Sequence, residues 1–180
     1  MDILDTHQRA QDAFAGVLAN VTDAQLDAPT TCPEWKVRDL VGHVVAGNRR
    51  MGGLDPADLS TTAAGIAADH ETSARAAQSA FAAPDGLTRT FEMPFGAVSG
   101  AEMAGLRSTD ALTHAWDLAR ATGQPTDIEP QLAAQLLDAV HGRITDDHRG
   151  PGRPFGPAAQ CASDAPAADR LAAYLGRSVG

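Results

Sequence analysis

The segment from Ser99 to Gly123 constrains the fold of this chain more than any other feature. Ser99 and Glu102 have the spacing of a capping box, in which two side chains satisfy free backbone N–H groups at a helix start. Gly123, followed by Pro125, is typical of a helix end. No proline interrupts the residues between these signals. The sequence therefore predicts one long, unbroken helix over 99–123.

The composition favours helices in the rest of the chain as well. Alanine is abundant, aromatic residues make up only 4% of the sequence, and the β-branched residues that strands prefer are thinly spread. A chain of 180 residues is the size of one domain and can bury a core without disulfides. We therefore predict an all-α fold.

Apolar residues at helical spacing mark the other expected helices. These cover about 2–20, a short turn at 22–25, 36–51, a stretch from 57 or 69 to 83, 130–144 and 164–176. Residues 87–95 alternate weakly and indicate either a short strand or an extended connection. Together these elements predict a four-helix bundle over residues 1–147, with residues 148–180 as a C-terminal extension packed on it.

The charge and the chain start exclude several classes of protein. The net charge is −9 and Lys36 is the only lysine, so we expect no nucleic-acid partner. No stretch approaches the roughly 18 apolar residues of a membrane-spanning helix, so we expect no membrane partner. The first residues lack the basic start and apolar core of a signal peptide, which predicts a cytoplasmic protein. There Cys32 and Cys161 should be reduced thiols.

Chemistry is most strongly indicated on the long helix. At about 100° per residue, Asp110, His114 and Asp117 lie on one face. A carboxylate and an imidazole four residues apart can chelate one metal ion. His43, in an apolar run of the second helix, is expected to point inward and supply a third ligand. Three ligands leave open positions on a metal, which suits catalysis better than a structural site.

Other readings of these residues stay open at this point. Asp110 and His114 can form a simple hydrogen-bonded pair, or Asp110 a salt bridge in a site without metal. His43 can be a satisfied core residue. We favour Asp117 as a residue that orients a ligating imidazole rather than as a ligand. Asp39 is either a helix-start charge or a second orienting carboxylate for His43.

The remaining aromatic, thiol and imidazole side chains are given structural roles. Trp35 and Trp116 are expected in the core, and Cys32 is expected as an inert buried thiol rather than a member of the site. Four further histidines show no partner pattern and are expected at the surface or without a specific role: His7, His70, His141 and His148.

Three segments of the chain resemble the signatures of a known family. They are Thr31–His43 (TCPEWKVRDLVGH), Asp110–Gly123 (DALTHAWDLARATG), and Pro154–Pro157 (PFGP) followed by residues 164–171. In this order they are similar to an actinobacterial branch of the mycothiol-dependent maleylpyruvate isomerase N-terminal domain family. The resemblance covers nearly the whole chain.

The resemblance implies a fold, a cofactor and a type of reaction. The family that the chain resembles belongs with the DinB-like and YfiT-like metalloenzymes, which are four-helix bundles. Carried over by motif, the metal ligands are His43, Asp110 and His114, and the metal is divalent, zinc or nickel. The implied activity is that of a thiol-dependent transferase or isomerase, with mycothiol as cosubstrate and an electrophilic small molecule as partner. The alternative is a non-catalytic metal-binding or stress-related protein on the same fold, and a homodimer is a further expectation.

Two departures from the family pattern narrow the expected reaction. The isomerase has glutamate at the position of the shorter Asp110. It also has a second, C-terminal domain that contributes to its site, for which a chain of 180 residues leaves no room. We therefore expect a related thiol chemistry rather than maleylpyruvate isomerisation itself.

Overall fold

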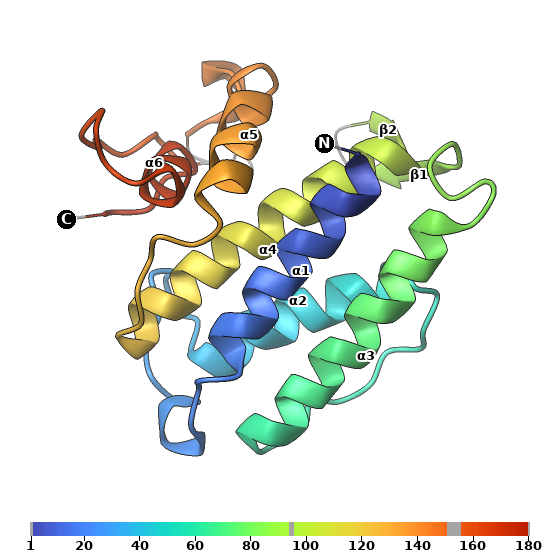
Figure 1. The fold of residues 1–180 in the computed structure, drawn as a ribbon, viewed down its shortest axis with the longest axis horizontal. Coiled ribbons are helices and arrows are strands. Elements are labelled where there is room, and N and C mark those ends of the chain that lie inside the picture. The colour runs from blue at the N-terminus through green and yellow to red at the C-terminus, as the bar shows by residue number, and fades with distance from the viewer. Residues whose placement is uncertain (1, 94–95, 151–155, 180) are drawn as a thin grey trace.

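The structure, a computed structural model, describes residues 2–93, 96–150 and 156–179, and these are mostly helical (Figure 1). The α-helices in these residues are α1 (Ile3–Leu18), α2 (Val37–Met51), α3 (Ala63–Ala82), α4 (Gly100–Thr122), α5 (Pro130–His141) and α6 (Ala167–Tyr174). Two 3₁₀ helices, η1 (Asp23–Gln25) and η2 (Asp146–His148), and two strands, β1 (Thr90–Met93) and β2 (Gly96–Ser99), complete the elements.

The long helix α4 begins and ends at the predicted signals. The Ser99 Oγ accepts a hydrogen bond from the Glu102 backbone N–H at 3.3 Å, and a Glu102 carboxylate oxygen accepts one from the Ser99 backbone N–H at 2.8 Å. Gly123 follows the last turn with φ +71°, a left-handed conformation that glycine adopts without strain. The predicted helix over 99–123 is therefore confirmed to within a residue at each end.

The first four helices pack against one another around a shared core. In Figure 1, α1 and α4 run alongside each other, and α2 and α3 lie next to them. Fully buried side chains from each helix meet between them, among them Phe14 of α1, Leu40 and Val44 of α2, Ile66 of α3 and Leu118 of α4. This packing places α2 against α4, the two helices that carry the predicted site residues.

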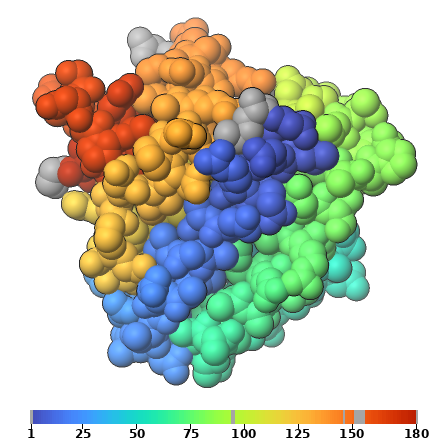
Figure 2. Space-filling view, viewed as in Figure 1, coloured from blue at the N-terminus to red at the C-terminus, as the bar shows by residue number. Residues whose placement is uncertain are grey.

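The last two helices extend the core on the other side of α4. Leu132 of α5 and Leu171 of α6 are buried with Trp116, which is 1% exposed and lies in the core as predicted. The Trp116 Nε1–H donates to the Asp169 carboxylate at 2.6 Å, so α6 is tied to α4. Figure 2 shows α1 at the surface between α3 and the C-terminal part of the chain. The domain boundary expected at 147/148 stays a prediction.

A small sheet modifies the all-α expectation. Strands β1 and β2 form an antiparallel hairpin, with Thr90 opposite Ser99 and Met93 opposite Gly96. Only the first strand was anticipated, as one reading of 87–95, because the second runs directly into the cap of α4. Phe95 and the first two residues of the PFGP motif lie outside the described residues.

Other elements differ slightly from their predicted bounds. Helix α3 starts at Ala63, between the two expected starts, and α5 ends at His141, before the buried Ile144. Among the helices that the structure describes, none is both long enough and apolar enough to cross a lipid bilayer.

Two of the four histidines expected at the surface are in fact buried. His7 is 0% exposed and His70 is 1% exposed. The His7 Nδ1–H donates to the Gln78 side-chain oxygen at 2.6 Å, and the His70 Nε2–H donates to the Gln11 oxygen at 3.1 Å. The surface prediction was wrong because each partner lies on a different helix, where no local pattern reveals it. His141 and His148 are exposed, as expected.

Candidate metal centre

Helices α2 and α4 bring His43, Asp110 and His114 together. The Asp110 Oδ1 lies 3.2 Å from the His43 Nε2 and 3.4 Å from the His114 Nε2. One donor atom from each of the three side chains lies within 4.8 Å of both others. The residues that the sequence placed on two separate helices therefore form one cluster that could hold a metal ion.

The two distances from Asp110 to the histidines are compatible with a tetrahedral ion. Zinc binds imidazole nitrogen and carboxylate oxygen at about 2.0–2.1 Å, so two ligands on adjacent tetrahedral corners lie about 3.3–3.4 Å apart. The two distances from the Asp110 Oδ1, 3.2 and 3.4 Å, are close to that edge length. Two imidazoles and a carboxylate are also ligands that divalent zinc accepts.

The cluster lies at the edge of the helical core, and this corrects the expectation for His43. Its side chain is 40% exposed, whereas the side chains of Asp110 and His114 are 27% and 7% exposed. His43 lies on the rim of the buried face of α2, whose centre is formed by Leu40 and Val44. The cluster is therefore exposed to solvent on the His43 side.

Trp35 packs against the edge of the core, which it was expected to join, and it also lies beside the cluster. It is half-buried, and its ring centroid lies 5.0 Å from that of His43 and 5.9 Å from that of His114. The two imidazoles themselves meet edge to face at 5.0 Å. Trp35 thus forms an apolar wall next to both histidines.

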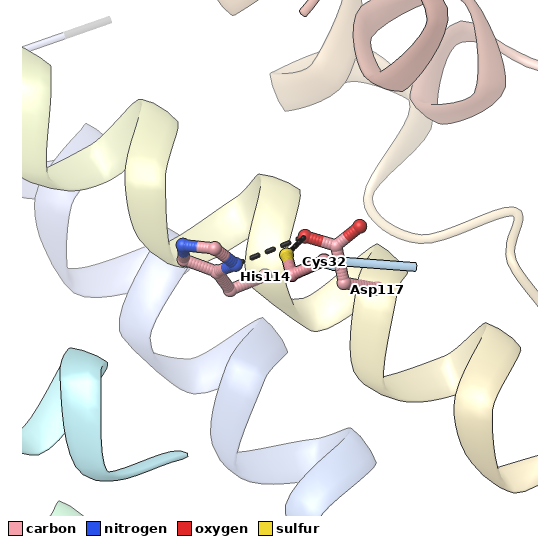
Figure 3. A group of neighbouring side chains, drawn as sticks. All are labelled: Cys32, His114 and Asp117. Carbon is pink, nitrogen blue, oxygen red and sulfur yellow. Dashed lines mark hydrogen bonds and ion pairs between the residues drawn. The ribbon is translucent and has the colours of Figure 1, made fainter. Parts of the chain in front are cut away.

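Asp117 holds the His114 ring through the nitrogen that does not face Asp110, and Figure 3 shows this contact between His114 and Asp117. The His114 Nδ1–H donates to the Asp117 Oδ2 at 2.9 Å, and the Asp117 side chain is fully buried. This leaves the His114 Nε2 directed at Asp110, as a ligating imidazole requires. Asp39, the other carboxylate considered for such a role, accepts a hydrogen bond from the Lys36 backbone N–H at 2.9 Å and caps the start of α2.

Three residues that the sequence did not place in the site also contact Asp117. The Thr31 hydroxyl donates to its Oδ1, the Arg177 Nη2 donates to its Oδ2 at 3.1 Å, and the Cys32 Sγ lies 3.5 Å from the same oxygen. Cys32, His114 and Asp117 form a second group with donor atoms within 4.8 Å of one another. Thr31 and Cys32 stand in the recognised Thr31–His43 segment, but Arg177 has no local signal.

The charges in the cluster are mutually stabilised. Burial alone would raise the pKa of Asp110, but hydrogen bonds from His114 and His43 and the charge of Arg107 hold it well below its usual range. Burial alone would lower the pKa of His114, but its bonds to Asp110 and Asp117 raise it well above the ordinary value.

Asp117 and Arg177 show the same opposition between burial, which disfavours their charged forms, and neighbouring charges, which favour them. Burial opposes ionisation of Asp117, yet the His114 bond and the Arg177 charge lower its pKa to about 2. Burial likewise disfavours the charged form of Arg177, but Asp117 raises its pKa above the usual value. Ionised carboxylates at positions 110 and 117 therefore surround His114, one facing each ring nitrogen.

Comparison with known proteins agrees with the first of the three motifs, Thr31–His43. Two uncharacterized proteins from Mycobacterium tuberculosis, of the CDC 1551 / Oshkosh and H37Rv strains, are each 49% identical to this chain over 181 residues, covering 99% of the chain and 100% of the relative. No solved structure matches the chain significantly. Residues 7–63, which include His43, match the family described as Mycothiol maleylpyruvate isomerase N-terminal domain. This chain therefore belongs to the mycothiol maleylpyruvate isomerase N-terminal domain family.

Proposed function

We propose that this protein binds one divalent metal ion through His43, Asp110 and His114, and uses it in a thiol-dependent transfer or isomerisation. The observation that carries the proposal is the three-ligand cluster itself, with the Asp110 Oδ1 at 3.2 and 3.4 Å from the two imidazole nitrogens and an exposed side at His43. Three protein ligands leave at least one position for a small molecule. Membership of a family named for a mycothiol-dependent isomerase supports a small thiol in that position.

The protein residues have separate roles in this proposal. When bound, a divalent zinc or nickel ion would favour the thiolate form of a coordinated thiol, which is the nucleophilic form. Asp117 fixes the His114 ring so that Nε2 is available. Trp35 provides an apolar wall on one side of the histidines, and the exposed side of His43 admits the thiol and an electrophile.

The finer assignments of fold and location belong to the same proposal. We assign α1–α4 to the DinB-like four-helix bundle, because these four helices share one core that faces the site. We also assign the protein to the cytoplasm, where Cys32 and Cys161, which are free in the structure, stay reduced.

Metal content is the first test of the proposal. Elemental mass spectrometry on protein purified without a tag should find close to one zinc or nickel per wild-type chain, and a strong loss in His43→Ala and His114→Ala. His148→Ala is the matched control, because His148 is exposed and lies on η2 outside the cluster. Wild-type protein that stays metal-free after incubation with zinc and nickel would refute the metal site.

Thiol consumption separates the enzyme from its alternative. The metal-loaded protein should consume a small thiol in the presence of one of a panel of electrophiles, and His43→Ala should not. Stoichiometric metal without any thiol consumption would favour the non-catalytic metal-binding protein on the same fold.

A further inference from the structure

Arg107 contacts the candidate metal cluster from the inside of the protein. Its side chain, 11% exposed, lies one turn before Asp110 on α4, and its Nη1 donates to the Asp110 Oδ2 at 2.9 Å. Its Nη2 donates to the backbone oxygen of Val44 on α2 at 3.2 Å. The guanidinium thus holds one oxygen of Asp110 and leaves the other, Oδ1, facing the two imidazoles.

Gly47 of α2 provides the space that the guanidinium occupies. A Cβ atom built on Gly47 would lie only 2.5 Å from the Arg107 Cζ, so the guanidinium at the end of that flexible side chain would have to move away. Glycine inside a helix is less favourable than alanine, so this position needs a structural reason. The reason here is the close approach of the Arg107 guanidinium to the backbone of α2.

A buried hydrogen-bond network between α2 and α1 also holds Arg107. The Arg107 Nη2 also donates to the Asn48 Oδ1 at 3.4 Å, the Asn48 Nδ2 donates to the Gln11 Oε1 at 2.8 Å, and the Gln11 Nε2 lies 3.5 Å from the His7 Nε2. Asn48, Gln11 and His7 are all buried. The network therefore connects Asp110 through α2 to α1, and it fixes the position of the guanidinium.

We propose that Arg107 is a positioning residue of the candidate metal site and that the absence of a side chain at Gly47 leaves room for its guanidinium. Arg107 holds the Asp110 carboxylate in the orientation in which Oδ1 meets the His43 and His114 nitrogens. This inference rests on the proposed metal site, because it concerns how one of its ligands is oriented. Hydrogen-bond partners of metal ligands typically contribute about 10–100-fold to metal affinity.

The test measures the zinc affinity of three variants against the wild type by competition with a chromogenic chelator. Gly47→Ala, which displaces the guanidinium, and Arg107→Lys, which keeps the charge but loses the planar fork, should each weaken zinc binding by about 10–100-fold. Gly42→Ala is the matched control on the same helix. A Cβ at Gly42 would meet only the Leu59 Cδ2, at an ordinary 3.7 Å, so zinc affinity should be unchanged.

Two further readouts separate positioning from general damage to the fold. Circular dichroism and urea unfolding of the metal-free proteins identify any variant that fails to fold. The double variant should bind zinc no more weakly than the weaker single variant, since both changes break one contact. Additive losses from the two changes would overturn the proposal.

The outcomes for the proposal and for the metal site are distinct. Wild type that binds no zinc would refute the site and, with it, the role of Arg107. Wild type that binds zinc, while folded Arg107→Lys and Gly47→Ala bind it equally well or more tightly, would refute only the positioning role. Tighter binding would mean that repulsion between the guanidinium and the metal outweighs orientation of the carboxylate.

Discussion

At the scale of single residues, His70 illustrates the cost of burying an imidazole without an opposite charge. Its Nε2 is bonded to the Gln11 amide oxygen at 3.1 Å, and its ring lies 4.9 Å from that of Phe14. Burial lowers the pKa of His70 from 6.5 to about 4, because the charged form would lose its hydration. His114, also buried, is stabilised in its charged form instead by Asp110 and Asp117.

The His70 pKa predicts an acid-sensitive contribution to stability. Between pH 6.5 and about 4 the unfolded chain binds a proton at His70 that the folded chain does not, so stability falls as pH falls through this window. The full loss is roughly 3 kcal/mol, from about 1.4 kcal/mol per pKa unit. Urea unfolding from pH 7 to 4.5 should therefore show a steeper decline for wild type than for His70→Gln, which keeps a donor for Gln11.

The comparison of the two proteins isolates His70. Asp110 and Asp117 have lowered pKa values, so their contributions are present above the unfolded pKa and are lost at lower pH, equally in both proteins. The raised pKa of His114 gives a contribution that is lost as pH rises, again in both. Parallel stability curves for wild type and His70→Gln would contradict the assignment.

At the scale of the helices, the ends of α4 are determined by local chemistry. The Ser99–Glu102 capping box starts it, and Gly123 ends it in a left-handed conformation. Both features are independent of what the helix packs against. The length of α4 matters for the site, because it carries Arg107, Asp110, His114 and Asp117 on one continuous element.

The role of Gly123 at the end of α4 can be tested by replacing it with alanine and comparing the effect with the same replacement at Gly16 of α1. A Cβ on Gly123 would meet nothing within 4 Å, but φ is +71°, so Gly123→Ala should lower the free energy of unfolding by about 1–2 kcal/mol. Gly16 lies within α1 and is equally free of neighbours, so Gly16→Ala should raise it by about 0.5–1 kcal/mol. Thermal unfolding of both variants measures the difference. Equal effects of the two changes would contradict the backbone explanation.

At the scale of the whole molecule, the candidate metal site bridges α2 and α4. His43 comes from one helix, and Asp110 and His114 come from the other. Arg177, beyond α6, reaches the same region through Asp117 at 3.1 Å. An ion at this position would therefore connect separate parts of the fold, and its binding should stabilise the entire chain.

Metal binding should accordingly raise the unfolding temperature. At a free zinc concentration 100 times the dissociation constant the gain is about 2.7 kcal/mol, or about 5–10 °C for a domain of this size. Calorimetry with and without zinc measures the shift, and His43→Ala should abolish it. A shift of the same size in His43→Ala would place the bound zinc elsewhere.

Much of the helical framework and the residues of the cluster followed from the sequence alone. The capping box, Gly123 and the absence of proline define α4 locally, since each acts within one turn or through backbone geometry. The spacing of Asp110, His114 and Asp117 on one face is a property of the α-helix itself. The family motifs then connected these residues with His43, and the described structure brings them within reach of one another.

Tertiary structure alone decided how the cluster is surrounded and which side of it is open. The contacts of Trp35 with His114, of Arg177 with Asp117 and of Arg107 with Gly47 join residues far apart in the chain, and the exposure of His43 depends on how α2 packs against its neighbours. Helical periodicity predicts which face of a helix is buried, but it contains no information about which neighbour covers that face. The environment of the site is therefore set by packing between helices, where shape and buried charge select the partners.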